Sequence, residues 1–469
     1  MHKKILLLVA FFLTYHTLPA QNEEILGDWY GIGDVNGTKL RIVFHIDEDD
    51  GRLQATMDSP DQNAFGIKTD TVTFSNNKLT IKVNSILLTY QGELNSQQEI
   101  QGKILQRGIF NIPVTLGRKP LEAVIPERPQ EPKPPFDYQV EAVNFQNQKV
   151  GHSLAGTLTI PDTLGQYPAV VLISGSGPQN RDEEINGHKP FWVIADYLTR
   201  RGMAVLRYDD RGIGQSTGSF QEATTFDFAN DVSAAVAYLK SRKDIKKQKI
   251  GLIGHSEGGM IAPVVAATDK TIDFIVLLAG VGTTGREVYE AQTVLIANAK
   301  GIPPAFVQKT SNDIKVIIDA VVNYENPEES AEVISDFINS ELDLLPPEHV
   351  KSIGGREAKI KENLSIYNNK WMRTFLRFNP ADYLVQVKCP VLALNGTLDL
   401  QVPYDENLEA IKNALEAGGN KHYKVIPMEG LNHLFQHAKK GLPKEYGNIT
   451  ETFAPEALTI IGDWIREQE

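Results

Sequence analysis

From residue 169 onward, the chain alternates short, nearly uninterrupted apolar runs with longer segments of helical periodicity. Runs of this kind are typical of strands that are covered on both faces. Helices between consecutive strands allow the strands to lie parallel, with helices on both sides of the sheet. The five clearest runs are residues 169–173, 203–208, 250–253, 274–278 and 390–394. The alternation predicts a mostly parallel, doubly wound α/β sheet within residues 138–469.

Residues 286–376 interrupt this alternation between two of the apolar runs. The segment is charged and helical in pattern, as residues 313–318 illustrate. An insertion after a strand of a parallel sheet emerges at the carboxyl end of that strand, where ligands bind in such folds. We therefore predict a helical cap over about residues 286–376.

Residues 21–118 have a different pattern, in which short stretches of alternating polar and apolar residues are separated by Asp-Gly and Asn-Asn turn signals. This spacing predicts an antiparallel all-β domain, either a sandwich or an up-and-down barrel. The opening Gly27-Asp28-Trp29 resembles the Gly-x-Trp start of lipocalin-like barrels. Nothing in the domain points to catalysis, and binding of a glycan or of the cell wall is an open role for it.

A proline-rich segment, residues 119–137, separates the two patterns and is densest in proline over residues 129–135. Proline-rich segments adopt stiff, extended conformations and mark domain boundaries. The expected organisation is therefore a β-domain over residues 21–118, a linker over residues 119–137 and an α/β domain over residues 138–469.

Residues 1–20 have the features of an export signal. Lys3 and Lys4 precede an apolar core at residues 5–13, and the Leu-Pro-Ala sequence at residues 18–20 forms a cleavage site. The apolar core has about half the length that a bilayer requires, so no stable membrane insertion is expected. Because no cysteine lies at the cleavage point to carry a lipid, the predicted location is the periplasm or the cell exterior.

Composition limits the partners of the chain. The net charge is −12 and no Lys/Arg run stands out, which argues against nucleic acid as a partner. Cys389 is the single cysteine, so no intramolecular disulfide can form, and its place at the start of an apolar run predicts a small buried side chain. We expect no metal or other cofactor, and the oligomeric state is left open.

The pentapeptide Gly-His-Ser-Glu-Gly at residues 254–258 follows one of the apolar runs and opens onto a helical segment. A turn this tight between a strand and a helix needs small residues two positions either side of the serine. The serine is then held in a strained conformation with its hydroxyl projecting outward. We therefore predict that Ser256 is a nucleophile.

A nucleophilic serine needs a base, and the base needs an acid that orients it. In the hydrolase arrangement the chain order is Ser, then Asp or Glu, then His, each after a strand. Asp399 follows the apolar run 390–394, and His433 follows a strand-like run at residues 423–426. We predict Asp399 and His433 as the acid and the base. We set aside the histidines that lie in the wrong order or place, namely His152, His255 and His422.

Backbone N–H groups are expected to stabilise the oxyanion of the reaction. One belongs to Glu257, next to the nucleophile. The other belongs to the glycine-rich loop at residues 174–182, where Ser176 is the predicted donor.

With these motifs, residues 138–469 resemble the α/β-hydrolase superfamily. Residues 209–216 match its Asp-x-Arg-Gly-x-Gly-x-Ser loop, which the resemblance implies shapes the site without being catalytic. The loop at residues 174–182 is similar to one in a bacterial esterase subgroup described as serine-aminopeptidase-like. It departs from the commoner His-Gly start, which affects the identity of the oxyanion donor.

The favoured function is an exported serine hydrolase that cleaves carboxylic esters of small or medium acyl groups through an acyl-enzyme on Ser256. Cap residues that could line an acyl pocket are Tyr289, Tyr324, Trp371 and Phe375. The alternative enzyme is a serine aminopeptidase acting on peptides, which needs carboxylates to hold a free amine. Candidates for those carboxylates are Glu183, Glu184, Glu287 and Glu290. A third possibility is a binding protein that kept the fold and lost catalysis, against which the complete triad argues.

Overall fold

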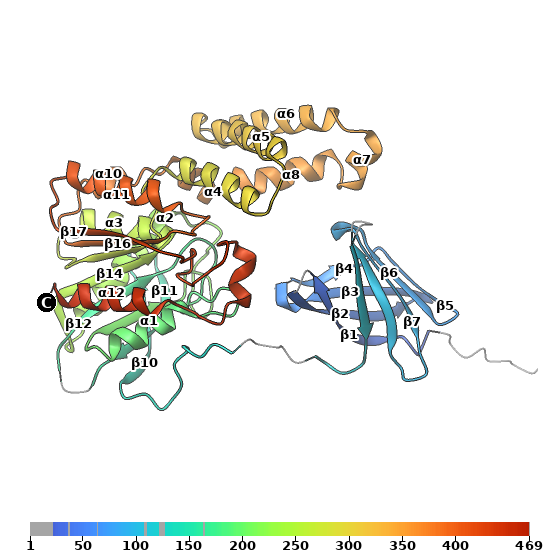
Figure 1. Cartoon of the computed structure of the whole chain (residues 1–469), viewed down its shortest axis with the longest axis horizontal. Helices are drawn as coiled ribbons and strands as arrows, with labels where there is room; N and C mark the ends of the chain where they lie inside the picture. Colours follow the sequence, from blue (N-terminus) through green and yellow to red (C-terminus); the bar gives the residue numbers. More distant parts are fainter. Residues whose placement is uncertain are drawn as a thin grey trace, which may run out of the picture. The chain divides into compact units, whose positions relative to one another are not determined.

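The computed structural model describes residues 22–35, 38–62, 64–106, 110–121, 127–162 and 165–468. The chain divides into two compact units, Met1–Val124 and Ile125–Glu469 (Figure 1). The predicted export signal, residues 1–20, lies outside the described residues. Within the described ranges, no helix combines the length and the apolar character needed to cross a bilayer.

The N-terminal unit is an antiparallel β-structure, as predicted. One sheet has the order β1-β2-β3-β4 and the other has the order β5-β6-β7-β8-β9, so strands that are consecutive in the chain are neighbours. The bounds are β1 (Gly27–Val35), β2 (Thr38–Asp49), β3 (Arg52–Ser59), η1 (Pro60–Gln62), β4 (Ala64–Lys68), β5 (Thr71–Ser75), β6 (Lys78–Val83), η2 (Asn84–Ile86), β7 (Leu88–Leu94), β8 (Ile100–Gln106) and β9 (Phe110–Leu116).

The two sheets adjoin on both sides and enclose one apolar core. β1 lies against β9, where Tyr30 and Gly117 form a bridge, and β3 lies against β5. Of the two expected alternatives, the sandwich and the up-and-down barrel, this arrangement corresponds to the barrel. Trp29 is fully buried, donates its indole N–H to the Ile25 carbonyl over 2.7 Å, and is covered by the Arg118 guanidinium at 3.7 Å from the ring centre. The Gly-x-Trp opening therefore contributes a central side chain to this core.

The C-terminal unit contains one sheet with the order β10-β11-β13-β12-β14-β15-β16-β17. β11 pairs antiparallel with both β10 and β13, and every pairing from β13 to β17 is parallel. This confirms the mostly parallel sheet. The bounds are β10 (Gln139–Asn147), β11 (His152–Ile160), β12 (Tyr167–Ile173), β13 (Ala204–Tyr208), β14 (Ile245–His255), β15 (Ile275–Leu278), β16 (Val391–Gly396) and β17 (Tyr423–Met428).

Helices cover both faces of this sheet, which explains why its central strands are apolar throughout. α1 and α12 pack on one face, and α2, α3 and α11 pack on the other (Figure 1). The bounds are α1 (Pro190–Thr199), α2 (Thr225–Ser241), α3 (Glu257–Thr268), α10 (Ala381–Leu384), α11 (Tyr404–Ala417), η3 (Pro443–Asn448) and α12 (Pro455–Arg466). The doubly wound architecture is confirmed.

A helical insertion lies between β15 and β16, as expected. α5 packs against α4 and α6, while α9 contacts α4, α5, α8 and also α2 of the sheet layer. Figure 1 shows α4–α8 gathered in one cluster. The bounds are α4 (Gly285–Ala299), α5 (Pro304–Asn323), α6 (Pro327–Asp343), α7 (Pro347–Ser352), α8 (Arg356–Tyr367) and α9 (Lys370–Arg377). Because β15 ends at Leu278, this insertion leaves the sheet at its carboxyl edge.

The expected linker over residues 119–137 is too long at its C-terminal end. Arg128 is 7% exposed, and its guanidinium donates to the carbonyls of Asn186, Gly187, Gly447 and Ile449 at distances from 2.5 to 3.3 Å. Gln130 accepts from the Thr452 N–H over 2.6 Å and donates to the Phe453 carbonyl over 2.6 Å. Proline content predicted an extended segment, but the side chains between the prolines bind this one to the α/β unit.

We propose that the α/β unit folds without the β-unit, provided that this segment is kept. A chain of residues 125–469 is expected to unfold in one cooperative transition. A chain of residues 138–469 lacks Arg128 and Gln130, and we expect it to lose about 3 kcal/mol or more of unfolding free energy because buried carbonyls lose their donors. Urea unfolding followed by circular dichroism compares the two chains. Equal stability would show that the segment contributes nothing, and aggregation of the longer chain would show that the β-unit is needed.

Candidate active site

Ser256 lies at the sharp turn between β14 and α3 and has a strained backbone. Its φ is 53° and its ψ is −115°, a combination outside the regions that non-glycine residues normally occupy. Its N–H donates to the Leu278 carbonyl of β15 over 2.9 Å, and its own carbonyl accepts from the Gly259 N–H over 2.9 Å. The sheet and the helix together therefore hold the strained residue in place.

Backbone atoms lie so close to the two glycines that flank Ser256 that neither position has room for a side chain. A Cβ on Gly254 would lie 2.0 Å from the Gly258 carbonyl oxygen, and a Cβ on Gly258 would lie 2.2 Å from that of Ile173. Neither position can accept a side chain without displacement of the backbone. The Gly-x-Ser-x-Gly spacing therefore follows from close packing within this turn at Gly254 and from the packing of the turn against β12 at Gly258.

The side chains of His433 and Asp399 form a buried pair, 6% and 0% exposed, with 2.7 Å between His433 Nδ1 and Asp399 Oδ2. The other oxygen, Asp399 Oδ1, accepts from the N–H groups of Gln401 and Val402 at 2.8 and 2.9 Å. A carboxylate only accepts hydrogen bonds, so Nδ1 of His433 carries the proton and Nε2 keeps its lone pair. This is the tautomer that a general base requires.

The three predicted residues follow β14, β16 and β17, whose carboxyl ends lie at one edge of the parallel sheet. His255, which precedes Ser256, has its ring centre 4.8 Å from that of His433. Its Nε2 lies 2.8 Å from the His433 carbonyl oxygen. The nucleophile turn and the loop that carries His433 are therefore in direct contact.

The loop after β12 passes beside Ser256. A Cβ on Gly175 would lie 3.1 Å from the Cβ of Ser256, while the Gly175 N–H donates to Glu183 Oε1 over 2.7 Å. The described residues provide no hydrogen-bond acceptor for the N–H groups of Ser176 and Glu257, the two predicted oxyanion donors. The N–H groups of Ser176 and Glu257 therefore remain the predicted oxyanion donors.

The loop after β12 is anchored to the Asp-x-Arg-Gly loop after β13. Arg181 donates to Asp209 through its backbone N–H at 2.8 Å and through its guanidinium at 2.7 and 3.0 Å. Burial by itself raises the pKa of Asp209, but the Arg181 contacts and a backbone N–H outweigh it, and the pKa lies below its usual value. Asp209 is thus a charged anchor, which fits a loop that shapes the site.

The backbone N–H of Glu257 is a predicted oxyanion donor, and the buried side chain of Glu257 bonds to two other elements. Glu257 Oε1 accepts from the Thr225 hydroxyl of α2 over 2.6 Å and from the Trp371 indole N–H of α9 over 2.9 Å. Burial raises the pKa of Glu257. Of the four cap residues named from the sequence, Trp371 therefore lies at the nucleophile turn. Phe375 stacks on it at 5.2 Å between ring centres.

The other two cap candidates have different surroundings. Tyr289 packs edge-on against Tyr367 within the cap, with 6.0 Å between ring centres, and Tyr324 is 40% exposed. The contacts found for these two side chains do not include the nucleophile turn.

The carboxylates considered for binding an amine all have structural partners. Glu183 is buried and bonds to Gly175 and His255, and Glu184 accepts weakly from Asn180 over 3.3 Å. The cap carboxylates are also engaged: Glu287 closes a capping box with Thr284, and Glu290 pairs with Arg286 at 2.9 Å. Within the described ranges, no cluster of three or more His, Cys, Asp or Glu side chains is arranged to hold a metal ion.

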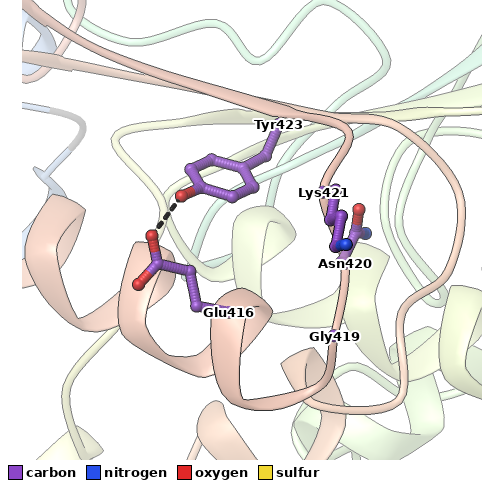
Figure 2. Close-up of a pocket in the computed structure, with 5 residues that line it drawn as sticks. All are labelled: Glu416, Gly419, Asn420, Lys421 and Tyr423. Atoms are coloured by element: carbon purple, nitrogen blue, oxygen red, sulfur yellow. Dashed lines mark hydrogen bonds between the residues drawn. The ribbon is translucent and has the colours of Figure 1, made fainter.

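A separate depression of about 460 Å³ lies where α11 joins β17 (Figure 2). It is lined by Glu416, Gly419, Asn420, Lys421 and Tyr423. Tyr423 begins β17, so the depression lies at the amino edge of the sheet, opposite the edge that carries Ser256. Asn420 donates to the Cys389 carbonyl over 2.9 Å and so holds the chain locally. This depression is not part of the Ser256 site.

Two buried residues near the nucleophile turn were not predicted as part of the site's hydrogen-bonded framework. His255 was set aside because of its place in the chain order, and Glu183 was considered only for amine binding. In the structure they bond to each other at 2.9 Å beside Ser256. A histidine directly before the nucleophile was a local signal for His255, but nothing local identified Glu183, 72 residues earlier, as its partner.

Comparisons with known proteins are consistent with this fold and motif order. The model of the family described as "Serine aminopeptidase, S33" matches residues 190–337. The esterase EstD of Thermotoga maritima is 28% identical over 313 residues, covering 66% of this chain and 65% of that protein. The protein YfhR of Escherichia coli is 28% identical over 139 residues, covering 29% of this chain and 45% of that protein. The chain thus spans less than two thirds of the length of these relatives.

Among solved structures, an esterase of Pyrococcus furiosus, Pf2001, is 15% identical with a TM-score of 0.44, covering 70% of this chain and 91% of that one. Together with the sheet order and the nucleophile turn, the sequence matches define the class: the chain belongs to the α/β-hydrolase superfamily. The similarity to EstD extends over 313 residues, a longer stretch than the similarity to YfhR.

Proposed function

We propose that this protein is a serine hydrolase that cleaves carboxylic esters of small to medium acyl groups. The observations that carry the proposal are the strained Ser256 at the end of β14 and the oriented His433–Asp399 pair, whose loop contacts the neighbouring His255. Similarity to a protein named an esterase supports the choice of ester bonds. The basic and apolar features of residues 1–20 support the further proposal that the chain is exported to the periplasm or the cell exterior.

In the proposed mechanism, His433 Nε2 takes the proton of the Ser256 hydroxyl as its oxygen attacks the ester carbonyl. The N–H groups of Ser176 and Glu257 stabilise the oxyanion that forms. His433 then returns the proton to the leaving alkoxide, so that an alcohol departs and an acyl group remains on Ser256. Water, deprotonated by His433, attacks this acyl-enzyme and releases the acid and free Ser256.

The second candidate is an aminopeptidase, which the description of the matched family favours. It is less well supported because Glu183, Glu287 and Glu290 are occupied by partners within the chain. Turnover of p-nitrophenyl esters and of aminoacyl p-nitroanilides, measured side by side, tests the proposal. We expect kcat/KM for the best ester to exceed that for every anilide. A preference for an anilide with a free amine would favour the peptidase instead.

We further propose that the cap helix α9 limits the length of the acyl group. Trp371 bonds to Glu257 at the nucleophile turn, so Trp371→Ala is expected to open space there. A single methylene contact is worth about 1–3 kcal/mol, so the preferred chain length is expected to shift with about tenfold changes in kcat/KM. Acetyl to octanoyl p-nitrophenyl esters provide the measurement.

The matched control for Trp371→Ala is Phe306→Ala, which removes an aromatic ring that is 65% exposed on α5 of the same cap. We expect this control to keep the wild-type chain-length profile. An unchanged profile in Trp371→Ala as well would contradict the role of α9.

A further inference from the structure

A buried chain of hydrogen bonds connects the three loops around Ser256. Glu183 Oε1 accepts from the Gly175 N–H over 2.7 Å and from His255 Nδ1 over 2.9 Å. The other ring nitrogen, His255 Nε2, lies 2.8 Å from the His433 carbonyl oxygen. The Glu183 and His255 side chains are 1% and 5% exposed. Glu183 also has a φ of 50°, in the left-handed region that few non-glycine residues adopt.

The partners determine where the protons lie. A backbone carbonyl only accepts, so the Nε2 that faces the His433 carbonyl must carry a hydrogen. A carboxylate oxygen also only accepts, so the Glu183 Oε1 that faces Nδ1 favours a donating Nδ1–H as well. His255 is then an imidazolium beside a carboxylate. Burial by itself lowers the pKa of His255, but the Glu183 charge and the hydrogen bonds outweigh it, and the pKa is raised.

We propose that Glu183 and His255 are positioning residues, which hold the oxyanion loop and the His433 loop in register with the nucleophile turn. The inference rests on the proposed function and adds to it two residues that do not touch the substrate. Breaking a buried ion pair leaves an uncompensated charge, so the pair resists separation of the loops that it joins. Since a shift of about 1 Å at a reacting group can lower the rate about 10²-fold, such an anchor matters for catalysis.

The pair also predicts a pH dependence. The groups that face His255 are Glu183 from the loop after β12, His433 from the loop after β17, and the Asp399 charge after β16. When pH rises through the raised pKa of His255, Nδ1 loses its proton and its lone pair faces the Glu183 carboxylate. The connection to Glu183 then breaks, so kcat is expected to fall on the alkaline side.

The stability of the fold is expected to change with pH in the same direction as kcat, falling as pH rises. Because the pKa of His255 is higher in the folded chain than in the unfolded chain, the folded chain binds more protons between the two values. The stabilisation is therefore fully present below the unfolded pKa of about 6.5 and is lost as pH rises through the folded value.

The experiment compares Glu183→Ala, Glu183→Gln and His152→Gln with the wild type. The last variant is the matched control, because His152 forms another buried His–carboxylate pair, 2.8 Å from Asp231. Three quantities are measured in the full chain: kcat and KM for a p-nitrophenyl ester from pH 6 to 10, the rate of labelling by a fluorophosphonate, and the thermal unfolding midpoint.

For Glu183→Ala we expect kcat and the labelling rate to fall about 10²-fold with KM changed by less than about threefold. Glu183→Gln keeps an acceptor for Gly175 and removes the charge, so most of the activity is expected to return and the alkaline fall in kcat to disappear. His152→Gln is expected to keep wild-type kcat even where its unfolding midpoint falls.

Labelling of Glu183→Ala at the wild-type rate would overturn the inference. A loss of kcat in Glu183→Ala no larger than the loss in His152→Gln would overturn it as well. Failure of the proposed function is a different result, because the wild type itself would then neither cleave esters nor react with the fluorophosphonate.

Discussion

Ser256→Ala is expected to lower kcat for a p-nitrophenyl ester by about 10⁴–10⁶-fold, the loss typical of removing a nucleophile that acts as a unit with its base. The residual rate would come from the oxyanion donors and from binding alone. Alanine keeps the Cβ, so the backbone strain of the turn at φ 53° is retained and the fold is not expected to change. The unfolding midpoint should therefore stay near that of the wild type.

The control for this substitution is Ser233→Ala on α2, which removes a hydroxyl that donates to the Ala229 carbonyl of its own helix. It is expected to leave kcat unchanged. If Ser256→Ala kept more than about one hundredth of the wild-type kcat, the nucleophile would have to be a different group.

Asp399→Asn is expected to lower kcat by about 10³–10⁴-fold through the tautomer of His433. Asp399 Oδ1 accepts from the N–H groups of Gln401 and Val402, so the carbonyl oxygen of an asparagine would occupy that position. Its NH₂ group would then face His433 Nδ1, which must become an acceptor. The proton moves to Nε2, and His433 can no longer take the proton of Ser256.

His433→Ala is expected to lower kcat about as much as Ser256→Ala, because the two act as a unit. The matched control for Asp399→Asn is Asp405→Asn, which changes an exposed carboxylate in the first turn of α11. We expect it to be silent, and steady-state kinetics on the same ester compare the four proteins. Wild-type kcat in Asp399→Asn would mean that Asp399 does not orient the base.

The architecture could be predicted because its signals are local. Continuous apolar runs report burial on both faces of a strand, and the glycines around Ser256 report a turn that excludes side chains at Gly254 and Gly258. The positions of Asp399 and His433 followed from chain order, since the carboxyl ends of parallel strands share one edge of the sheet.

The parts that could not be predicted depend on contacts between distant residues. Arg128 bonds to Ile449, 321 residues away, so proline content alone could not reveal that its segment belongs to the α/β unit. In the same way, Glu183 gains its role only when the fold brings it against His255. Among the cap aromatics, composition could not separate Trp371 at the nucleophile turn from the exposed Tyr324.

The central claim is that Ser256 forms the covalent bond to the substrate acyl group. The most direct test is to treat the full chain with a fluorophosphonate, digest it and locate the adduct by tandem mass spectrometry. We predict one adduct per chain on the peptide that contains Ser256, its absence from Ser256→Ala, and its strong reduction in His433→Ala. An adduct on another residue, or equal labelling of Ser256→Ala, would contradict the claim.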